Sequence, residues 1–70
     1  MSKIDSPVAG VLMQYAVKVG DAVTEGQEVA VMESMKMEIP ILAEVSGTVS
    51  KLCCEPGASV AEGATIIELG

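Results

Sequence analysis

An internal repeat constrains the fold of this chain more than any other feature of its sequence. Residues 6–33 align with residues 43–70 at a constant offset of 37, without a gap. Six of the 28 aligned pairs are identical, namely Val8/Val45, Gly10/Gly47, Gly20/Gly57, Val23/Val60, Glu25/Glu62 and Gly26/Gly63. Two copies are too few for a solenoid, so we expect them to close on each other with pseudo-two-fold symmetry.

Each copy has the pattern of short β-strands. Runs rich in Val and Ile alternate with regularly spaced glycines, which is typical of strands joined by tight turns. The pattern predicts strands at residues 10–17, 28–33, 47–54 and 65–69, and further strands at 4–6 and 37–43. A helix is the alternative only for residues 29–37, where the methionines mimic a helical stripe. The sum is a single all-β domain over residues 1–70, a flattened barrel-like sandwich of about eight strands.

The aligned apolar residues predict the core. They are the pairs Leu12/Val49, Tyr15/Leu52, Val29/Ile66 and Met32/Leu69, with Val23 and Val60 as single anchors. Strand alternation places Val29 and Val31 on one face. Turn geometry with positive φ is expected at Gly20, Gly26, Gly57 and Gly63. Pro7 and Pro40 cannot donate to a ladder, so we expect them at sheet edges or strand ends.

The composition excludes several classes of function. Four basic and ten acidic residues give a net charge of −6, which argues against nucleic acids and anionic membranes. The absence of His excludes Ser-His and Cys-His nucleophile pairs and His-ligated metals. Cys53 and Cys54 are adjacent, so we expect reduced thiols in a cytoplasmic setting, with Cys54 in the core and Cys53 exposed.

The segment between the two copies contains one lysine. Residues 34–38 read Ser-Met-Lys-Met-Glu, and a symmetric fold predicts that they form a hairpin on or near its axis, with Lys36 exposed at the tip. An exposed lysine in a turn is usually only a solubilising residue, and the methionines are compatible with an ordinary core. Methionines in a turn are nevertheless unusual, because turns favour Gly, Asn, Asp and Ser. A flexible, polarisable Met surface suits recognition by several partners.

These residues resemble the biotinyl-domain family. Residues 33–37 (Glu-Ser-Met-Lys-Met) resemble its Glu-Ala-Met-Lys-Met signature, with Ser34 in place of the usual Ala. Residues 6–10 resemble its Pro- and Gly-containing opening, residues 19–27 its Gly-Asp turn, and residues 46–49 the start of its second half. The resemblance covers essentially the whole chain and implies two four-stranded antiparallel sheets. No insertion interrupts residues 15–23, so the chain resembles the members that lack a thumb loop. Its length resembles that of the short, stand-alone members, and a domain cut from a larger carrier is the open alternative.

The resemblance also implies a function. Biotin is expected to be attached covalently to Lys36 by a biotin protein ligase, and the chain to be a non-catalytic carrier between a biotin carboxylase and a carboxyltransferase. Met35, Met37 and Ser34 are expected to contribute to ligase and partner recognition, although one methionine packing into the barrel is the alternative. The charge of Glu33 is expected to keep foreign ligases away. Neither metals, nucleic acids nor membranes are expected partners.

Three alternatives to this function remain open. A lipoyl domain shares the fold and the hairpin lysine, but lipoyl hairpins favour Asp-Lys-Ala where this chain has Met-Lys-Met. An unmodified interaction module is the second alternative, and a stand-alone enzyme is the third and weakest. The identity of the carboxyl donor and acceptor also stays open.

Overall fold

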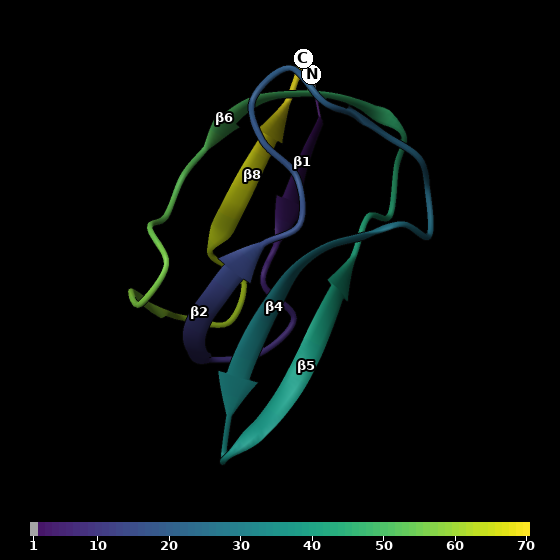
Figure 1. Cartoon of the computed structure of the whole chain (residues 1–70). Coiled ribbons are helices and arrows are strands. Elements are labelled where there is room, and N and C mark those ends of the chain that lie inside the picture. The colour runs from purple at the N-terminus through teal and green to yellow at the C-terminus, as the bar shows by residue number, and fades with distance from the viewer. Residues whose placement is uncertain (1) are drawn as a thin grey trace.

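The computed structural model describes residues 2–70 and contains eight β-strands (Figure 1). The strands are β1 (Ser2–Asp5), β2 (Gly10–Tyr15), β3 (Ala22–Val23), β4 (Glu28–Ser34), β5 (Met37–Leu42), β6 (Gly47–Leu52), β7 (Ser59–Val60) and β8 (Thr65–Leu69). Over these residues no helix forms, so none is long and apolar enough to cross a membrane. The expectation of an all-β domain is confirmed, and residues 29–37 form a β-hairpin rather than a helix.

The strands form two four-stranded antiparallel sheets with equivalent topology. One sheet has the order β5-β4-β2-β7 and the other the order β1-β8-β6-β3. The offset of 37 converts each strand of one sheet into its counterpart in the other, so β2 corresponds to β6 and β3 to β7. The predicted pseudo-two-fold symmetry is therefore confirmed at the level of strand order.

The symmetry extends to hydrogen bonds in the loops. The N–H of Gly20 donates to the carbonyl oxygen of Val49 at 2.9 Å, and at the equivalent place the N–H of Gly57 donates to that of Leu12 at 2.7 Å. Gly20, Gly26, Gly57 and Gly63 all have positive φ, between 84° and 96°. The turns after β2 and after β6 thus depend on glycine for the same reason, because other L-residues are strained in this conformation.

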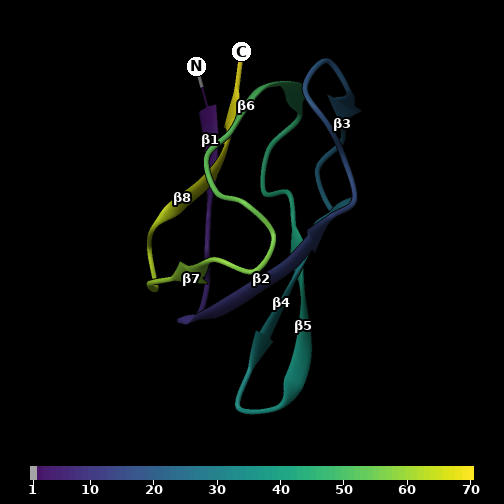
Figure 2. The same ribbon diagram turned by 60° about the vertical axis from the view of Figure 1, so that its left-hand side comes forward.

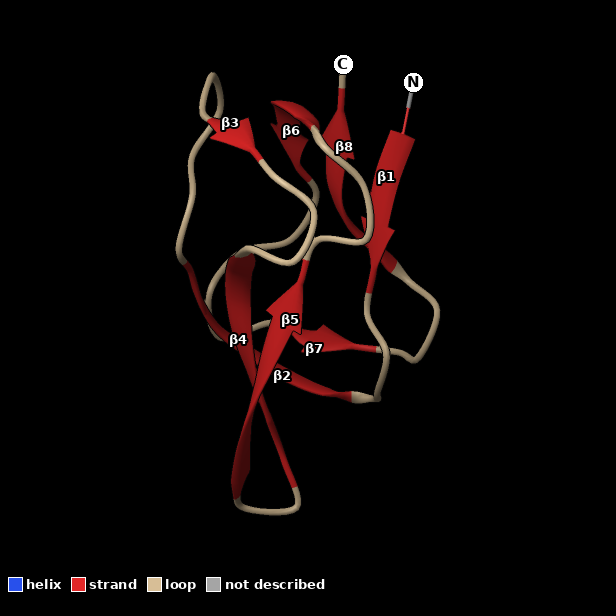
Figure 3. Cartoon of the chain, turned by 90° about the vertical axis from the view of Figure 1, so that its right-hand side faces the viewer, coloured by secondary structure: helices blue, strands red, loops and turns tan. Residues whose placement is uncertain are grey.

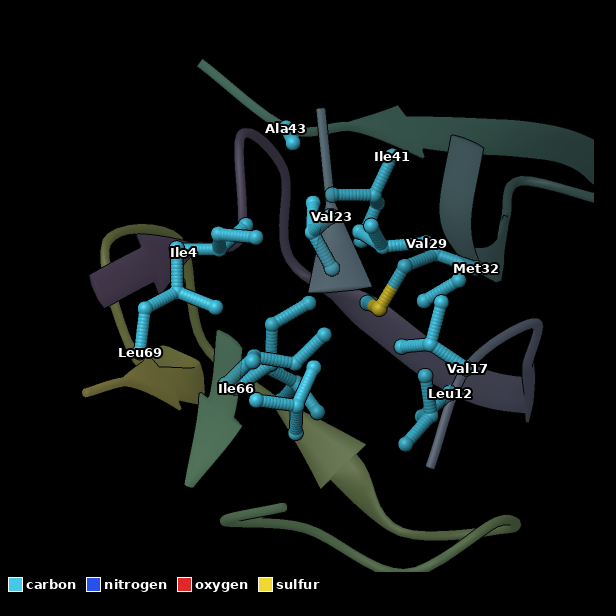
Figure 4. Close-up of a cluster of buried hydrophobic side chains, with 14 residues drawn as sticks. Ile4, Leu12, Val17, Val23, Val29, Met32, Ile41, Ala43, Ile66 and Leu69 are labelled. Atoms are coloured by element: carbon cyan, nitrogen blue, oxygen red, sulfur yellow. The ribbon is translucent and has the colours of Figure 1, made fainter. Parts of the chain in front are cut away.

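The core lies between the two sheets and is aliphatic (Figure 4). All the predicted core pairs contribute to it: Leu12, Val29, Met32, Val49, Ile66 and Leu69 are at most 1% exposed, and Tyr15 and Leu52 pack against them. Val23 and Val60 are also buried, as expected for anchors. Pro40 lies in the edge strand β5 and Pro7 follows the end of β1, so neither removes a hydrogen bond from a central ladder.

Several details of the expected strands are wrong. The strands predicted over residues 10–17 and 47–54 end at Tyr15 and Leu52. In the first copy, β2 ends two residues before its predicted end, and the N–H of Asp21 donates to the carbonyl oxygen of Lys18 at 3.0 Å in the turn that follows. In the second copy, the N–H of Ala58 donates an equivalent hydrogen bond to the carbonyl oxygen of Glu55 at 3.0 Å.

Val29 and Val31 do not share a face. A register shift between Glu28 and Ala30 interrupts the alternation of β4. Val29 and Ala30 are therefore both fully buried, whereas Val31 is only half-buried.

The molecule is elongated along the β4–β5 hairpin. It measures 31 × 19 × 18 Å, and the hairpin projects from the end opposite the two chain termini (Figures 2 and 3). At the other end, Ser2 pairs with Leu69. The hairpin tip is thus the part of the domain farthest from where the chain begins and ends.

Candidate functional site

The tip of the hairpin is a two-residue turn that contains Lys36. The β4–β5 ladder ends with the pair Ser34/Met37, which leaves only Met35 and Lys36 to reverse the chain. Both have positive φ, 53° and 65°, as in the type I′ turns that match the twist of a hairpin. The expectation that Lys36 lies exposed at a hairpin tip is confirmed.

This turn is strained by its sequence. Type I′ turns favour Asn-Gly, because a side chain in the left-handed region costs about 1–2 kcal/mol per residue. Among residues 2–70, Met35 and Lys36 are the only non-glycine residues with positive φ. The six paired positions of the β4–β5 ladder hold the strained turn in place. Strain of this kind concentrates at functional sites.

The side chains at the turn face solvent. Met35 is 92% exposed and Met37 65% exposed, so the alternative in which one methionine packs into the barrel is wrong. Lys36 takes part in none of the side-chain hydrogen bonds found over residues 2–70. The amine is therefore free to react, while the backbone that carries it is held by two strands.

Gly10 lets a neighbouring strand approach the base of the hairpin. A Cβ atom at this position would overlap the carbonyl oxygen of Glu33 and lie 3.2 Å from the Cβ of Ser34. Ser34 is half-buried at this contact, which explains why a small residue suits the position that precedes Met35. We assigned no role to Gly10 from the sequence, although a glycine inside a strand is the signal for close backbone approach.

Two carboxylates flank the turn. Glu33 and Glu38 are directly opposite each other on β4 and β5, one pair further from the tip than Ser34 and Met37. Both are exposed. Like charges at directly opposite positions of two strands are destabilising. The five predicted site residues 33–37 lie together at the hairpin tip with Glu38, and all of them except the half-buried Ser34 are exposed.

Tyr15 joins the two sheets and reaches the cysteine segment. Its hydroxyl donates to the carbonyl oxygen of Ile66 on β8 at 2.9 Å and accepts from the N–H of Cys54 at 3.1 Å. Burial raises the pKa of the Tyr15 phenol, partly offset by the hydrogen bond from the Cys54 backbone. The single aromatic residue is thus structural, and it lies away from the hairpin tip.

The two cysteines do not behave as a reactive pair. Cys54 packs against the core as expected, whereas Cys53 is half-buried and not exposed as predicted. Its Sγ lies 3.7 Å from Oε2 of Glu68. Burial first, and then the Glu68 carboxylate, raise the pKa of the Cys53 thiol. A raised pKa lowers the thiolate fraction, which is the nucleophilic form.

The hairpin geometry agrees with comparisons with known proteins. Residues 2–69 match a biotin/lipoyl family model described as "biotin-requiring enzyme". The chain belongs to this biotin/lipoyl family. It is 50% identical over 62 residues to the biotin/lipoyl attachment protein of Bacillus subtilis, an alignment that covers 89% of this chain and 85% of that protein. The family resemblance drawn from residues 33–37 is confirmed.

Larger relatives contain this biotin/lipoyl domain as a small part. The chain is 46% identical over 68 residues to the human mitochondrial propionyl-CoA carboxylase alpha chain, covering 97% of this chain but 9% of that protein. Among solved structures, Kluyveromyces lactis urea carboxylase superimposes with a TM-score of 0.91 at 29% identity, covering 99% of this chain and 6% of that one. The biotin/lipoyl domain therefore retains one architecture in short and in very long proteins.

Proposed function

We propose that this chain is a non-catalytic biotin carboxyl carrier, with biotin joined by an amide bond to Nζ of Lys36. The observation that carries the proposal is the exposed amine of Lys36 on a strained, two-residue turn, in a chain of the biotin/lipoyl family. The biotin carboxyl carrier protein of Streptococcus mutans, 38% identical over 64 residues, supports the same role.

Attachment requires a nucleophilic amine that a second enzyme can reach. In the proposed reaction, Nζ of Lys36 attacks the carbonyl carbon of biotinyl-adenylate, the C–N bond forms and AMP leaves. Amide formation releases a proton from the attacking nitrogen, and a group in the active site of the ligase must accept it. The carrier contributes position: the projecting turn keeps the amine away from the barrel, where a ligase active site can surround it.

The proposed carrier role depends on a rigid hairpin backbone and on the flexible side chain of Lys36. Lys36 would hold the biotin, and the bound biotin would supply the carboxyl-carrying chemistry needed at two active sites. The ladder between β4 and β5 fixes the turn, whereas the long lysine stem stays mobile. Tethering raises the effective concentration of the attached group at the sites of a biotin carboxylase and a carboxyltransferase. These two enzymes are the proposed partners.

Intact mass spectrometry tests the attachment site. After incubation with a biotin protein ligase, biotin and ATP, we expect the wild-type chain to gain the mass of one biotin. Lys36→Arg should gain nothing, because arginine keeps the charge but cannot form this amide. Lys51→Arg is the matched control, since Lys51 lies in β6 away from the hairpin, and it should be modified like the wild type.

The same experiment separates biotin from lipoate. The Bacillus subtilis relative is named for both groups. Incubation with a lipoate ligase and lipoate should leave the chain unmodified if Met35 and Met37 select the biotin enzyme. Gain of a lipoyl group in place of biotin, or biotin on Lys36→Arg, would overturn the proposal.

A further inference from the structure

The two halves of the chain depend on each other for most of their strand pairing. We call residues 2–34 the first segment and residues 37–70 the second segment, and the turn at Met35 and Lys36 joins them. Of the six strand ladders formed over residues 2–70, four connect the two segments, namely β1–β8, β2–β7, β3–β6 and β4–β5. Each segment therefore needs the other, but the pairing does not require that both belong to the same chain.

The connection between the two segments is strained. Met35 and Lys36 have φ of 53° and 65°, a region that disfavours residues with side chains. Two-residue turns of this type favour Asn-Gly instead. If both residues become extended, the strain is removed, and β4 and β5 form one long strand that carries the second segment away from the first. Short connections under strain favour the exchange of such segments between two copies of a chain.

Extension of the turn also changes the surroundings of the two opposed carboxylates. In the closed hairpin, Glu33 and Glu38 are directly opposite each other, which is destabilising. Continuing the register of this ladder through an extended turn places Lys36 of one copy opposite Met35 of the other. Lys36 then lies on the same face as Glu38 of its own strand and diagonally across from Glu33 of the second copy. The lysine charge therefore offsets the repulsion between the carboxylates.

The shape of the molecule leaves room for a second copy beyond the turn. The hairpin projects from the rest of the molecule at the end opposite the two termini (Figures 2 and 3). Two molecules that exchange their second segments therefore meet tip to tip, with one barrel at each end of a two-stranded ribbon. Every strand ladder of the single chain is kept, and the former turn residues add new pairs to it.

We propose that the unmodified chain forms a dimer by exchanging its second segment with a second copy, with Met35 and Lys36 as the hinge. Each barrel of this dimer contains residues 2–34 of one copy and residues 37–70 of the other. Dimerisation depends on concentration, because in the closed hairpin the complementary segment is tethered to the same chain.

The exchange also regulates the site, an inference that rests on the proposal that Lys36 is the attachment site. In the single chain, Lys36 lies at a free end of the molecule. In the dimer, it lies inside a continuous ladder with a barrel on either side. An active site that must surround a turn cannot surround this position. Segment exchange therefore withholds Lys36 from a biotin protein ligase.

Two hinge variants shift the exchange in opposite directions. Each chain is unfolded in urea and refolded over a range of concentrations, and analytical ultracentrifugation measures the dimer. Met35→Asn/Lys36→Gly supplies the residues that the closed turn favours, and it should raise the dimer dissociation constant about tenfold. Deletion of residues 35–36 leaves no residue to reverse the chain, so this variant should be dimeric throughout. If the deletion variant does not refold, the comparison of the wild type with the double variant decides.

Met37→Asn is the matched control for the hinge. Met37 lies next to the turn but has no positive φ, and it pairs with Ser34 both in the closed hairpin and in the exchanged ribbon. This variant should therefore keep the dissociation constant of the wild type.

A disulfide between the two segments distinguishes exchange from side-by-side association. Oγ1 of Thr65 in β8 donates to Oδ1 of Asp5 in β1 at 2.8 Å, so these side chains are in contact. Asp5→Cys/Thr65→Cys is made in a chain whose native cysteines carry their repeat mates, Cys53→Ala/Cys54→Val. After mild oxidation, the monomer should contain a bridge within one chain. The exchanged dimer should run as a covalent dimer on a non-reducing denaturing gel, because each bridge then joins two chains.

The separated species test whether exchange withholds Lys36. Monomer and dimer of the wild-type chain are isolated by gel filtration and incubated with a biotin protein ligase, biotin and ATP, for times shorter than their interconversion. Intact mass spectrometry measures the biotin gained. We expect the dimer to be modified about tenfold more slowly than the monomer.

The outcomes separate this inference from the attachment proposal. A wild-type chain that stays monomeric at every concentration, or a dimer whose bridges all lie within single chains, would overturn the exchange. Equal rates of biotin incorporation into monomer and dimer would overturn its regulatory role. Failure of the monomer itself to accept biotin would instead contradict the attachment proposal.

Discussion

The β4–β5 hairpin and the β8–β1 pair have equivalent strand pairing, but only the hairpin carries the candidate site. Their registers correspond residue by residue: Val31 pairs with Pro40 in the hairpin, and Glu68 pairs with Lys3 in its counterpart. In the hairpin, a strained turn joins the two strands and presents Lys36. In the β8–β1 pair, no turn joins the strands, because β1 follows the N-terminus and β8 precedes the C-terminus.

The comparison separates what the fold requires from what the site requires. Features that recur in both copies, such as the turn glycines and buried aliphatic residues at equivalent positions, build the barrel. Features found in one copy alone lie around the hairpin: a two-residue turn without glycine, a pair of opposed carboxylates, and the exposed apolar residues Val11, Met13 and Leu42. Mutations at symmetry-related positions should therefore reveal where the two copies differ.

The largest difference is expected between Gly10→Ala and Gly47→Ala. A Cβ at position 10 would overlap the backbone of Glu33, which cannot move without displacing the hairpin, whereas a Cβ at position 47 meets side-chain atoms of Leu69 at 3.2 Å. We expect a loss in the free energy of unfolding of about 3 kcal/mol for Gly10→Ala and about 1 kcal/mol for Gly47→Ala. Urea denaturation measures both, and equal losses would contradict the role assigned to Gly10.

A loss of about 2 kcal/mol is expected for Tyr15→Phe. The change removes two hydrogen bonds and leaves the carbonyl of Ile66 and the N–H of Cys54 without this partner. The symmetry-related Leu52→Ala removes only apolar contacts and serves as the comparison.

The pH dependence distinguishes Tyr15 further. Burial raises the pKa of its phenol above the ordinary value of 10.0, so the unfolded chain loses this proton first as the pH rises. The contribution to stability is therefore complete below pH 10.0 and is lost as the pH rises through the raised pKa. Urea denaturation across alkaline pH should show a smaller decline for Tyr15→Phe than for the wild type, and an identical decline would exclude this assignment.

Met35→Asn should stabilise the protein by about 1 kcal/mol. Asparagine adopts the left-handed conformation more readily than methionine, and it is preferred at this place in type I′ turns. Met37→Asn is the control, because Met37 does not have positive φ and should gain no stability. Thermal unfolding compares the two, and an unchanged midpoint for Met35→Asn would show that the turn is not strained.

The smallest effects are expected on the two outer faces and have opposite signs. Glu38→Gln relieves repulsion from Glu33 and should stabilise the fold by about 0.5 kcal/mol. Glu68→Gln removes a charge that is flanked by two lysines and should destabilise the fold by a similar amount. Thermal unfolding at low ionic strength measures the sign of the stability change in each variant. The same sign for both variants would show that the two outer faces do not differ electrostatically.

The sequence alone determined the symmetric barrel, its core and the lysine at the tip. The offset of 37 is visible without coordinates, and glycine spacing and aliphatic pairs predict turns and core because those requirements are local or repeat exactly. Strand ends and the register shift in β4 were not predictable in this way. A bulge depends on how neighbouring strands pair, and the pattern of one strand does not contain that information.

Only the tertiary structure decided how the site is built. It brings Gly10 against Glu33 and places Glu33 opposite Glu38. It also places β2 beside the β4–β5 hairpin, although β3 separates them along the chain. The positive φ of Met35 and Lys36 likewise comes from the twist of a closed ladder, because neither residue type prefers that conformation alone. Local conformational preferences and hydrophobic pattern specify the turns and the core that both copies share. Long-range strand pairing imposes the strained turn and the opposed carboxylates that distinguish the hairpin.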